Sequence, residues 1–483
     1  AFGPYRPPVR RGAALDERQR AYVASLVAGH GARTAGSRTW AQAHRRHLAD
    51  PRAIVGFRPD WKGLVYPLVV AHAEGARMRD VDGNEYVDLV MGFGANLLGH
   101  MPPAVREACA RAIAEGGSLG MQTRLAGEVA GLVSELTGMP RVTFCNTGSE
   151  AVMTAIRLAR ARTGRRRIAV FNGAYHGTFD EVLVRPQRGA SGTVSPRPIA
   201  PGVAPHLVGE TLVVEYGDPD ALRLLEAHAH DLAAVLVEPV QSRRPGLVPV
   251  DFLHALRARC SEWGTALVFD EIATGVRGHA GGERGLFGVR ADLATYGKIA
   301  GGGMPIGLVT GTPEYMDAID GGFWEYGDAS GPEADLTFFA GTFCKHPVAV
   351  AAAHAVLTRL RDAGPALQRD LDARAEGLVA RLQPFLDARG VPLRLERFSS
   401  LVRLTFDASE PHAPVFFYPL LARGVHLWEG RTAFLSTAHD DAALAHVERA
   451  VRESVDELQA AGFLVGAPRT DAIAPSSQRA APV

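Results

Sequence analysis

Short apolar runs alternate with amphipathic helical segments along the middle of the chain, from about residue 103 to residue 347. Each run is apolar on successive residues, which is the pattern of a strand buried on both faces. Such strands, separated by helices, are typical of a parallel sheet that helices cover on both sides. We therefore expect an α/β fold with a mostly parallel sheet, built from runs that begin at Arg141, Arg167, Leu232, Thr265, Asp292 and Ile306.

The segments on either side of this region predict a second, smaller α+β domain. Residues 76–90 read as two strands around a turn at Asp82-Gly83-Asn84, and residues 348–362 have helical spacing before further strand-like runs. The tails are rich in Pro, Ala and Arg, as linkers often are. We expect a linker-like tail (1–20), an N-terminal segment of the small domain (21–102), a large domain (103–347), the C-terminal part of the small domain (348–465) and a second linker-like tail (466–483).

The composition argues against a nucleic-acid-binding protein and against a membrane protein. The 483 residues are 47% hydrophobic and 22% charged, and 52 basic residues balance 52 acidic ones. This balance gives no electrostatic footprint for nucleic acid or for an anionic membrane. No apolar run approaches the roughly 20 residues that span a bilayer, and no signal-peptide pattern is visible. The four cysteines have no metal-ligand spacing, so we expect a reduced cytoplasmic protein without a metal, a membrane or a nucleic-acid partner.

Three of the predicted strands end in charged residues. Glu238 ends "AAVLVE", Asp270 ends "ALVFD" and Lys298 follows "LATYG". Each alone is more often a solvated strand end, but in open α/β sheets the ligand site lies at the carboxyl ends of the strands. Two carboxylates and an amine would therefore converge in one crevice. The glycine run 301–303 after the lysine leads us to expect that something other than protein packing fills the space around the amine.

A phosphate site is predicted at a helix start in the segment 141–160. A short strand is followed by Asn-Thr-Gly-Ser and then by an amphipathic helix. Unpaired backbone N–H groups at such a helix start bind phosphate, with Gly148 allowing close approach and Ser149 adding a hydroxyl. The same residues are equally compatible with a simple helix cap at Thr147 or Ser149.

Pyridoxal phosphate is the cofactor that fits these pieces together. No G-x-G-x-x-G follows a predicted strand, and a P-loop is excluded because Ile299 follows Lys298. The Lys298 amine would form a Schiff base with the cofactor aldehyde, Asp270 would keep the ring nitrogen protonated, and Gly148 and Ser149 would hold the phosphate. Lys298, once released, would be the general base, and burial beside a cationic ring would lower its pKa.

The segment "FNGAYHGTFD" offers an aromatic residue to cover the cofactor ring. Tyr175 lies just beyond the predicted strand that begins at Arg167, although core packing is an equally good explanation for this tyrosine. His176 beside it is expected to make a supporting hydrogen bond and not to act directly in catalysis.

Taken together, these motifs resemble the class III, or ω-type, aminotransferases of the fold-type I pyridoxal phosphate enzymes, a group that includes glutamate-1-semialdehyde aminomutase. The resemblance covers about residues 65–464 and rests on "DVDGNEYVDL", "NTGSEAVMTAIRLAR", "YHG", "VEPV", "FDEIATGVR", "YGKIAGGGMPIG" and "FFAGTFCKHPVA". It implies a homodimer with active sites at the interface, in which Thr342 reaches the phosphate held by the partner chain. It also implies that Glu238 lies near the ring as a gating residue and that Gln241 bonds the ring hydroxyl.

A closer resemblance is to the aminotransferase domains embedded in polyketide and nonribosomal peptide synthases. It rests on "FGPYRP", "VEPVQSRRPGLVP", "FWEYGD", "TFFAGTFCKHPVAVAAA" and "WEGRTAFLSTAHD". It implies amino transfer from an amino acid to a ketone or aldehyde of an acyl chain on an acyl or peptidyl carrier protein, commonly at the β-carbon. The donor carboxylate would need an arginine, for which Arg431 and Arg403 are candidates that are also explained by structural roles.

One departure from the broader family leaves the substrate open. "VEPVQ" is followed by Ser-Arg-Arg-Pro and not by a glycine-rich run. The alternatives are an aminomutase of the glutamate-1-semialdehyde type, which needs no separate donor, and an ω-aminotransferase that acts on a free small carbonyl compound. A cofactor-binding or carrier-docking protein without turnover is disfavoured because Lys298, Asp270 and Tyr175 are all present.

Overall fold

The computed structural model describes residues 14–117, 119–188, 194–407 and 410–466, and these form two compact units. The first unit comprises residues 103–370, and the second comprises residues 14–102 and 371–466. The first unit therefore extends 23 residues beyond the boundary expected at 347. Helix α11 (Pro347–Ala363) explains the difference, because its buried alanine-rich face packs on α3 (Pro103–Glu115) and α4 (Arg124–Thr137) of the first unit.

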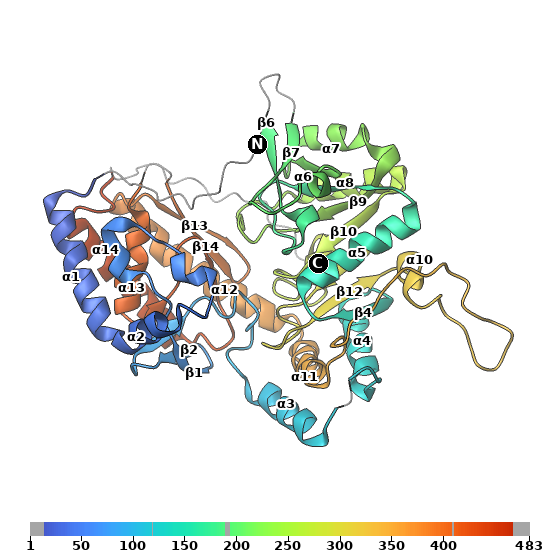
Figure 1. The fold of residues 1–483 in the computed structure, drawn as a ribbon, viewed down its shortest axis with the longest axis horizontal. Coiled ribbons are helices and arrows are strands. Elements are labelled where there is room, and N and C mark those ends of the chain that lie inside the picture. The colour runs from blue at the N-terminus through green and yellow to red at the C-terminus, as the bar shows by residue number, and fades with distance from the viewer. Residues whose placement is uncertain (1–13, 118, 189–193, 408–409, 467–483) are drawn as a thin grey trace. The chain divides into compact units, whose positions relative to one another are not determined.

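The first unit is built on a seven-stranded sheet in the order β4-β12-β11-β10-β9-β5-β8. Six strands run parallel, and β12 alone runs antiparallel, between β4 and β11. The expected mostly parallel sheet is confirmed (Figure 1). Its strands are β4 (Arg141–Cys145), β5 (Arg167–Phe171), β8 (Thr211–Val214), β9 (Leu232–Val237), β10 (Ala266–Asp270), β11 (Leu293–Tyr296) and β12 (Gly307–Gly311).

Helices bury both faces of this sheet. Even-numbered residues of β5, β9 and β10 pack with the apolar side of α5 (Gly148–Thr163) in one core cluster. Phe171 of β5 is an odd-numbered residue, so its side chain lies on the other face of the sheet. There it makes an edge-to-face contact with Phe252 of α8 (Val250–Trp263), and α8 therefore covers that face. The remaining elements are α6 (Pro205–Val208), α7 (Pro219–Glu226), α9 (Gly282–Phe287), α10 (Pro313–Met316) and the antiparallel pair β6 (Val184–Arg188) and β7 (Val194–Pro198).

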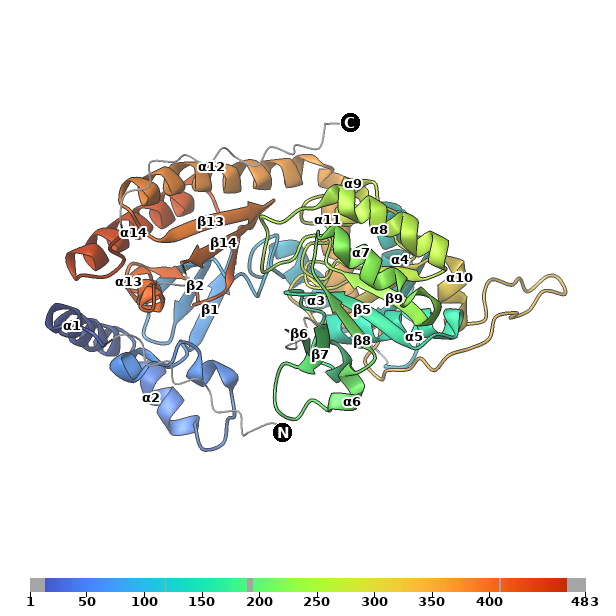
Figure 2. The same cartoon turned by 90° about the horizontal axis from the view of Figure 1, so that it is seen from above.

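A long segment between α10 and α11 extends away from the rest of the first unit. Figures 1 and 2 both show that this segment leaves the unit after α10 as an open arm without helix or strand, and residues 337–346 then return to the unit, where Phe339 packs on the core and Arg157 bonds the Phe338 carbonyl. Several of its large apolar side chains face solvent: Phe338 is 78% exposed and Tyr326 is 96% exposed. Such a concentration of exposed aromatic residues is unusual for a surface that stays uncovered.

The second unit combines two small sheets with helices. In one sheet β1 (Val70–Glu74), β2 (Arg77–Asp80) and β3 (Glu85–Asp88) are antiparallel, and β15 (Val425–His426) pairs with β3 in parallel. The other sheet is β13 (Leu393–Phe398), β14 (Leu401–Phe406) and β16 (Thr432–Phe434), all antiparallel. The helices are α1 (Glu17–Arg33), α2 (Ala35–His44), α13 (Phe417–Ala422), α14 (Asp441–Ala460) and α12 (Ala366–Ala388), which begins within the first unit.

The predicted hairpin is present as β2 and β3, whereas β1 and β13 were not predicted. α1 begins at Glu17 with a capping box between Asp16 and Gln19, so a helix begins inside the segment expected to be a tail. Residues 1–13 and 467–483 of the two expected tails lie outside the described residues.

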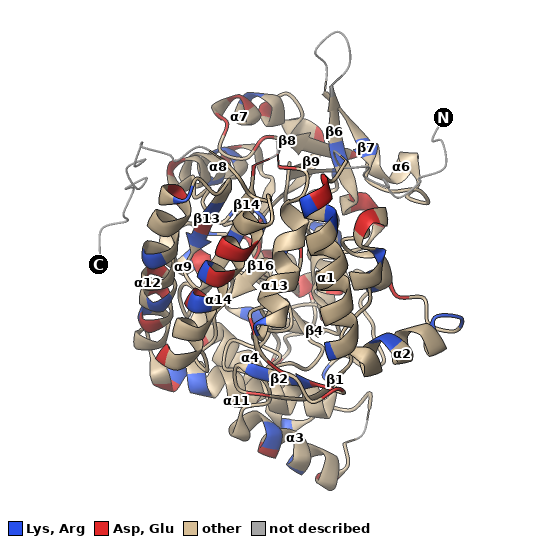
Figure 3. Cartoon of the chain, turned by 90° about the vertical axis from the view of Figure 1, so that its left-hand side faces the viewer, with Lys and Arg blue, Asp and Glu red and all other residues tan. Residues whose placement is uncertain are grey.

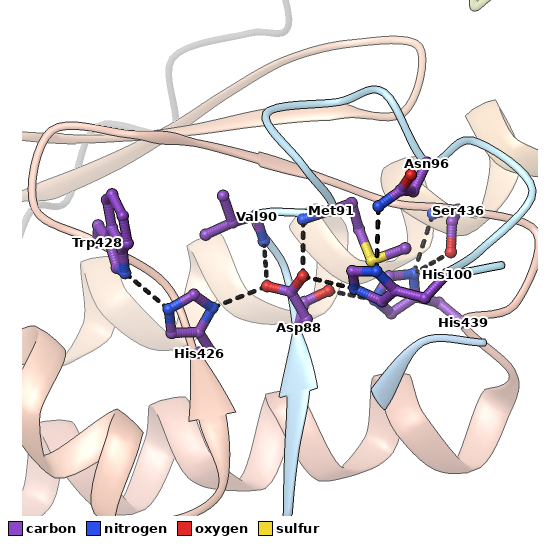
Figure 4. A network of polar contacts seen from close by, with 9 residues as sticks. All are labelled: Asp88, Val90, Met91, Asn96, His100, His426, Trp428, Ser436 and His439. Carbon is purple, nitrogen blue, oxygen red and sulfur yellow. Dashed lines mark hydrogen bonds and ion pairs between the residues drawn. The ribbon is translucent and has the colours of Figure 1, made fainter. Parts of the chain in front are cut away.

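A network of polar contacts around Asp88 joins the two chain segments of the second unit (Figure 4). The Asp88 carboxylate accepts hydrogen bonds from His426 Nδ1 at 2.8 Å and from His100 Nε2 at 2.9 Å. Trp428 Nε1 donates to His426 Nε2 at 2.6 Å. Because Nε2 accepts this bond it carries no proton, so the imidazole is neutral and its proton is on Nδ1. β3 supplies the aspartate and β15 supplies His426, and the network therefore fixes the parallel strand pair at its end.

Charges of both signs alternate on the helices that cover the second unit. On the side that Figure 3 shows, basic and acidic residues are interspersed along α12 and α14. Arg381 and Arg452 both pair with Glu448, at 2.7 and 2.9 Å, which accounts for part of this pattern. Among the described residues, no helix combines the length and apolarity that a membrane span requires.

Candidate active site

The carboxyl ends of neighbouring strands bring the predicted residues of the first unit to one edge of its sheet. Glu238 follows β9, Asp270 ends β10, and Lys298 lies two residues after β11. β9 and β11 both pair in parallel with β10, so these three strand ends lie side by side. The predicted convergence of two carboxylates and one amine is therefore what the strand order produces.

The Asp270 carboxylate is held in place by several hydrogen-bond donors. Its side chain is buried and bonds His176 Nδ1 at 2.8 Å, while the backbone N–H of Ile272 donates to Oδ1 at 3.1 Å. Thr295 of β11 adds a longer hydroxyl contact at 3.4 Å. The other ring nitrogen of His176 is buried without a partner. These donors fix the orientation of the carboxylate, as the partner of a ring nitrogen requires.

Lys298 has the electrostatic surroundings of a reactive amine. Burial lowers its pKa, Glu238 and Asp270 oppose this shift, and Arg277 adds to it, with the net result that the pKa lies below the ordinary value. A larger share of the amine is then uncharged near neutral pH. An uncharged amine can attack a carbonyl carbon or accept a proton, neither of which an ammonium group can do.

The glycines that follow Lys298 pack closely against other parts of the protein, which is a second reason for their presence beside the space expected around the amine. Gly302 has φ +56°, and a Cβ added there would lie 2.6 Å from Cγ2 of Val356 on α11. A Cβ on Gly301 would lie 2.2 Å from the carbonyl oxygen of Met304. Gly301 and Gly302 let the turn behind the lysine pack directly on its neighbours, and so they help to position Lys298.

The start of α5 offers backbone donors next to this edge. Thr147 caps the helix by accepting the N–H of Glu150 at 3.2 Å, so the cap belongs to Thr147 and not to Ser149. The Ser149 hydroxyl instead accepts the N–H of Thr178 at 3.2 Å. The N–H groups of Gly148 and Ser149, in the first helical turn, are positions where a phosphate can bind. A Cβ on Gly148 would lie 2.9 Å from Ile272, which follows Asp270 by two residues.

Tyr175 and Glu238 are joined through the backbone. The N–H of Tyr175 donates to Glu238 Oε2 at 2.9 Å, and Ser242 donates its hydroxyl to Oε1 at 3.0 Å. Burial raises the pKa of Glu238, although His176 and these hydrogen bonds oppose the shift. The Tyr175 ring is 43% exposed and lies under the guanidinium of Arg243 at 5.3 Å. This exposure excludes core packing as the explanation for Tyr175.

The amide of Gln241 is largely engaged by protein groups. Its Nε2 donates to the carbonyl of Asn172 at 3.2 Å, and its Oε1 accepts from Arg244 Nε at 2.7 Å. Arg244 also donates to the Asn172 carbonyl. The Ser-Arg-Arg-Pro segment that departs from the broader family thus has two roles, because Arg244 supports Gln241 and Arg243 covers Tyr175.

The remaining predicted residues are not brought to this edge by any contact within the first unit. Thr342 is exposed on the arm. Arg431 and Arg403 belong to the second unit, where Arg431 lies over the Phe93 ring at 5.6 Å and Arg403 donates to the carbonyl of Gly430.

Sequence reasoning missed several residues of the site: Thr295, Ser242, Arg243 and Arg244. A polar residue inside the otherwise apolar run of β11 is the signal that marks Thr295. For the other three, the signal is the unusual Ser-Arg-Arg segment directly after "VEPVQ", which was noted without a role.

A family comparison decides what kind of site this is. The model of the aminotransferase class-III family matches residues 60–430. The chain belongs to the class III aminotransferases. Like the family, it is a pyridoxal phosphate-dependent enzyme, and the residues at the sheet edge fit that cofactor: an amine of lowered pKa, a buried and fixed carboxylate, and N–H groups at a helix start.

Individual relatives of this class III aminotransferase differ in their reactions. The chain is 37% identical over 415 residues to a glutamate-1-semialdehyde 2,1-aminomutase of Deinococcus radiodurans, covering 81% of this chain and 90% of the relative. The structure of a transaminase with pyridoxal phosphate bound is 30% identical, with TM-score 0.78 and coverage of 89% and 99%. A β-phenylalanine aminotransferase of Variovorax paradoxus is 28% identical, with TM-score 0.78 and coverage of 92% and 98%.

Proposed function

We propose that the sheet edge of the first unit holds pyridoxal phosphate through the residues described above. Lys298 binds the cofactor aldehyde covalently, and Asp270, held by His176, faces the ring nitrogen. Gly148 and Ser149 bind the phosphate. Tyr175 would cover the ring, Glu238 would lie near it, and the second amide hydrogen of Gln241 would be available to its hydroxyl. The adjacency of Asp270 and Lys298 at the ends of paired strands carries this assignment.

The cofactor, when bound, supplies a carbonyl that captures an amine and a cationic ring that accepts electrons from the substrate. The chain supplies the rest. Lys298 would take a proton from the carbon that bears the donor's amino group and deliver it to the carbon of the cofactor aldehyde, and with the acceptor it would move a proton in the opposite direction; its lowered pKa favours this role. Asp270 stabilises the positive charge of the ring, and the network from His176 and Thr295 keeps its carboxylate in place.

We propose that the acceptor is a ketone or aldehyde of a polyketide or peptide intermediate, in the form of a β-keto acyl thioester on a carrier protein, and that an amino acid is the donor. Support comes from the segments that resemble aminotransferase domains of polyketide and peptide synthases. It also comes from the structural likeness to the β-phenylalanine aminotransferase of Variovorax paradoxus, whose name refers to a β-amino acid. Arg243, exposed above Tyr175, is a candidate partner for an anionic group of either substrate. Arg431 and Arg403 remain the candidates that the sequence offers for the donor carboxylate.

An aminomutase of the glutamate-1-semialdehyde type is the second candidate. The 37% identity to an aminomutase over most of both chains favours it. An aminomutase moves an amine within one molecule, so it forms an isomer of the substrate and consumes no donor. An ω-aminotransferase on a free carbonyl compound shares the donor requirement and differs only in the acceptor.

A mass-spectrometric assay of the holoenzyme separates these reactions. One incubation contains L-glutamate and a 3-oxoacyl chain on a carrier protein, a second contains the same chain as a free acid, and a third contains glutamate-1-semialdehyde alone. The proposal predicts 2-oxoglutarate and the aminated chain in equal amounts, fastest with the carrier-bound acceptor. An isomer formed in the third incubation, with no amination in the other two, would contradict it in favour of the aminomutase.

We also propose a homodimer in which the arm reaches the partner chain and Thr342 bonds the partner's cofactor phosphate. Class III aminotransferases are typically homodimers. The exposed aromatic residues of the arm support an arrangement in which a second copy covers them.

A further inference from the structure

The second unit contains a cavity of about 100 Å³ with walls that come only from that unit. It is bounded by α1, by residues 52–68, by α13 and by the residues that follow β15. Aromatic rings and aliphatic side chains share the walls. A cavity of this order accommodates a group about the size of one aromatic ring, since an apolar cavity of about 150 Å³ binds benzene. The lining rings are Tyr66, Phe417, Tyr418 and Trp428.

His30 places an unpaired polar atom among these rings. The residue is only 8% exposed, and its Nε2 is buried without a hydrogen-bond partner. The imidazole lies 4.9 Å from the Tyr66 ring and 6.0 Å from the Tyr418 ring. Burial, with a smaller contribution from Arg33, lowers the pKa of His30 to about 4, so this imidazole is neutral at physiological pH. A neutral ring nitrogen can exchange a hydrogen bond with an uncharged ligand.

Glu429 contributes a second unpaired atom to the same walls. Its Oε1 accepts from Arg58 at 3.1 Å, whereas its Oε2 is buried without a partner. Gly56, with φ +73°, keeps this corner open, because a Cβ there would lie 3.0 Å from Glu429 Oε2 and 3.7 Å from the Tyr418 hydroxyl oxygen. His30 and Glu429 both line the cavity, so a group bound there can exchange a hydrogen bond with the imidazole or the carboxylate.

The charges around the cavity are already paired. Arg52 binds Asp50 at 2.8 Å and Arg58 binds Glu429 at 3.1 Å. A charged ligand would therefore have to break an existing pair. We propose that this cavity is a binding site for an uncharged molecule, or an uncharged part of one, with an apolar body about the size of one ring and a hydroxyl or amide N–H group that bonds His30 or Glu429.

Fluorine NMR of the holoenzyme with two matched probes tests this site. 4-Fluorophenol carries the hydroxyl that the site requires, and 4-fluorotoluene has the same ring without it. We expect saturable binding of 4-fluorophenol, roughly three- to tenfold tighter than that of 4-fluorotoluene, which is the usual effect of one hydrogen bond. His30→Phe keeps a ring in place of the imidazole and should reduce this preference, as should Glu429→Gln at the other unpaired atom.

Occupancy of the cavity is tested by filling it. Leu421→Trp places an indole at the cavity wall and should abolish binding of both probes, whereas Leu48→Trp, at an exposed leucine outside the lining, should leave binding unchanged. Val55→Phe fills the cavity from the opposite wall if Leu421→Trp does not fold. The site is refuted if neither probe binds saturably, if binding survives both filling variants, or if neither His30→Phe nor Glu429→Gln changes the preference for the phenol.

Discussion

At the scale of single residues, the site depends on side chains whose charge is controlled by burial and by hydrogen bonds. Lys298 is shifted toward its neutral form, whereas Asp270 is surrounded by donors that favour its charged form. Both the lowered pKa of Lys298 and the fixed orientation of the Asp270 carboxylate follow from the position of these residues at the sheet edge. One group becomes a base, and the other becomes a fixed negative charge.

His176 is expected to act through Asp270. Replacing it in His176→Phe removes the 2.8 Å bond to the carboxylate and keeps an aromatic ring. A hydrogen bond to a charged group contributes about 1.5–3 kcal/mol, so we expect the dissociation constant of pyridoxal phosphate to rise roughly 10- to 100-fold. Equilibrium dialysis measures this constant, and the exposed His230→Phe is the control. An unchanged constant in His176→Phe would show that the bond does not support the cofactor site.

At the scale of elements, turns and strand ends decide the geometry. The sequence alone indicated six of the seven strands of the large sheet, because each is a continuous apolar run. β8 was missed. Strand order and the antiparallel direction of β12 depend on which runs pair, and pairing depends on contacts between distant segments. For the same reason the bond between His176 and Asp270, 94 residues apart in the chain, could not be predicted although both residues were.

The turn after Lys298 tests the role of close packing. Gly302→Ala adds a methyl group at φ +56°, 2.6 Å from Val356, whereas Gly116→Ala adds one at φ +67° with no atom within 4 Å. Both variants bear backbone strain, but only the first bears a steric overlap, which typically costs about 1–3 kcal/mol. Urea unfolding should show the larger loss of stability in Gly302→Ala. Equal losses would mean that backbone strain alone explains the glycine.

The Asp88 network predicts a pH dependence of stability. Burial alone would raise the pKa of Asp88, but hydrogen bonds from His100 and His426 outweigh this effect and hold the pKa well below its ordinary value. The carboxylate therefore stabilises the fold above about pH 4, the ordinary pKa of an aspartate, and this contribution is lost as the pH falls below it. Asp88→Asn should cost about 1.5–3 kcal/mol at pH 7, the effect of weakening hydrogen bonds to a charged group, and less at pH 3.5.

Urea unfolding at the two pH values measures this difference, with Asp60→Asn as the control at an exposed carboxylate. The same penalty for Asp88→Asn at both values would contradict the role given to the ionised carboxylate.

At the scale of the whole molecule, the arm between α10 and α11 is the feature that a single copy of the chain does not explain. Phe338→Asp places a charge on a side chain that is 78% exposed, where it has no effect unless another chain covers it. Burying an unpaired charge in an interface is costly, so we expect at least a tenfold rise in the dimer dissociation constant. Sedimentation velocity measures it, with Leu224→Asp, at a position 55% exposed on α7, as the control. A dimer unchanged by Phe338→Asp would place the interface elsewhere.

The visible absorption spectrum of the purified protein, recorded before and after addition of L-glutamate, tests the central claim most directly. We expect the wild type to show the band of lysine-bound pyridoxal phosphate and to convert to the spectrum of the pyridoxamine form. Lys298→Ala should show no lysine-bound band and should lose at least about 10³-fold in the rate of conversion, because the same amine is also the base. A lysine-bound band that persists in Lys298→Ala would contradict the assignment of Lys298 and with it this account of the active site.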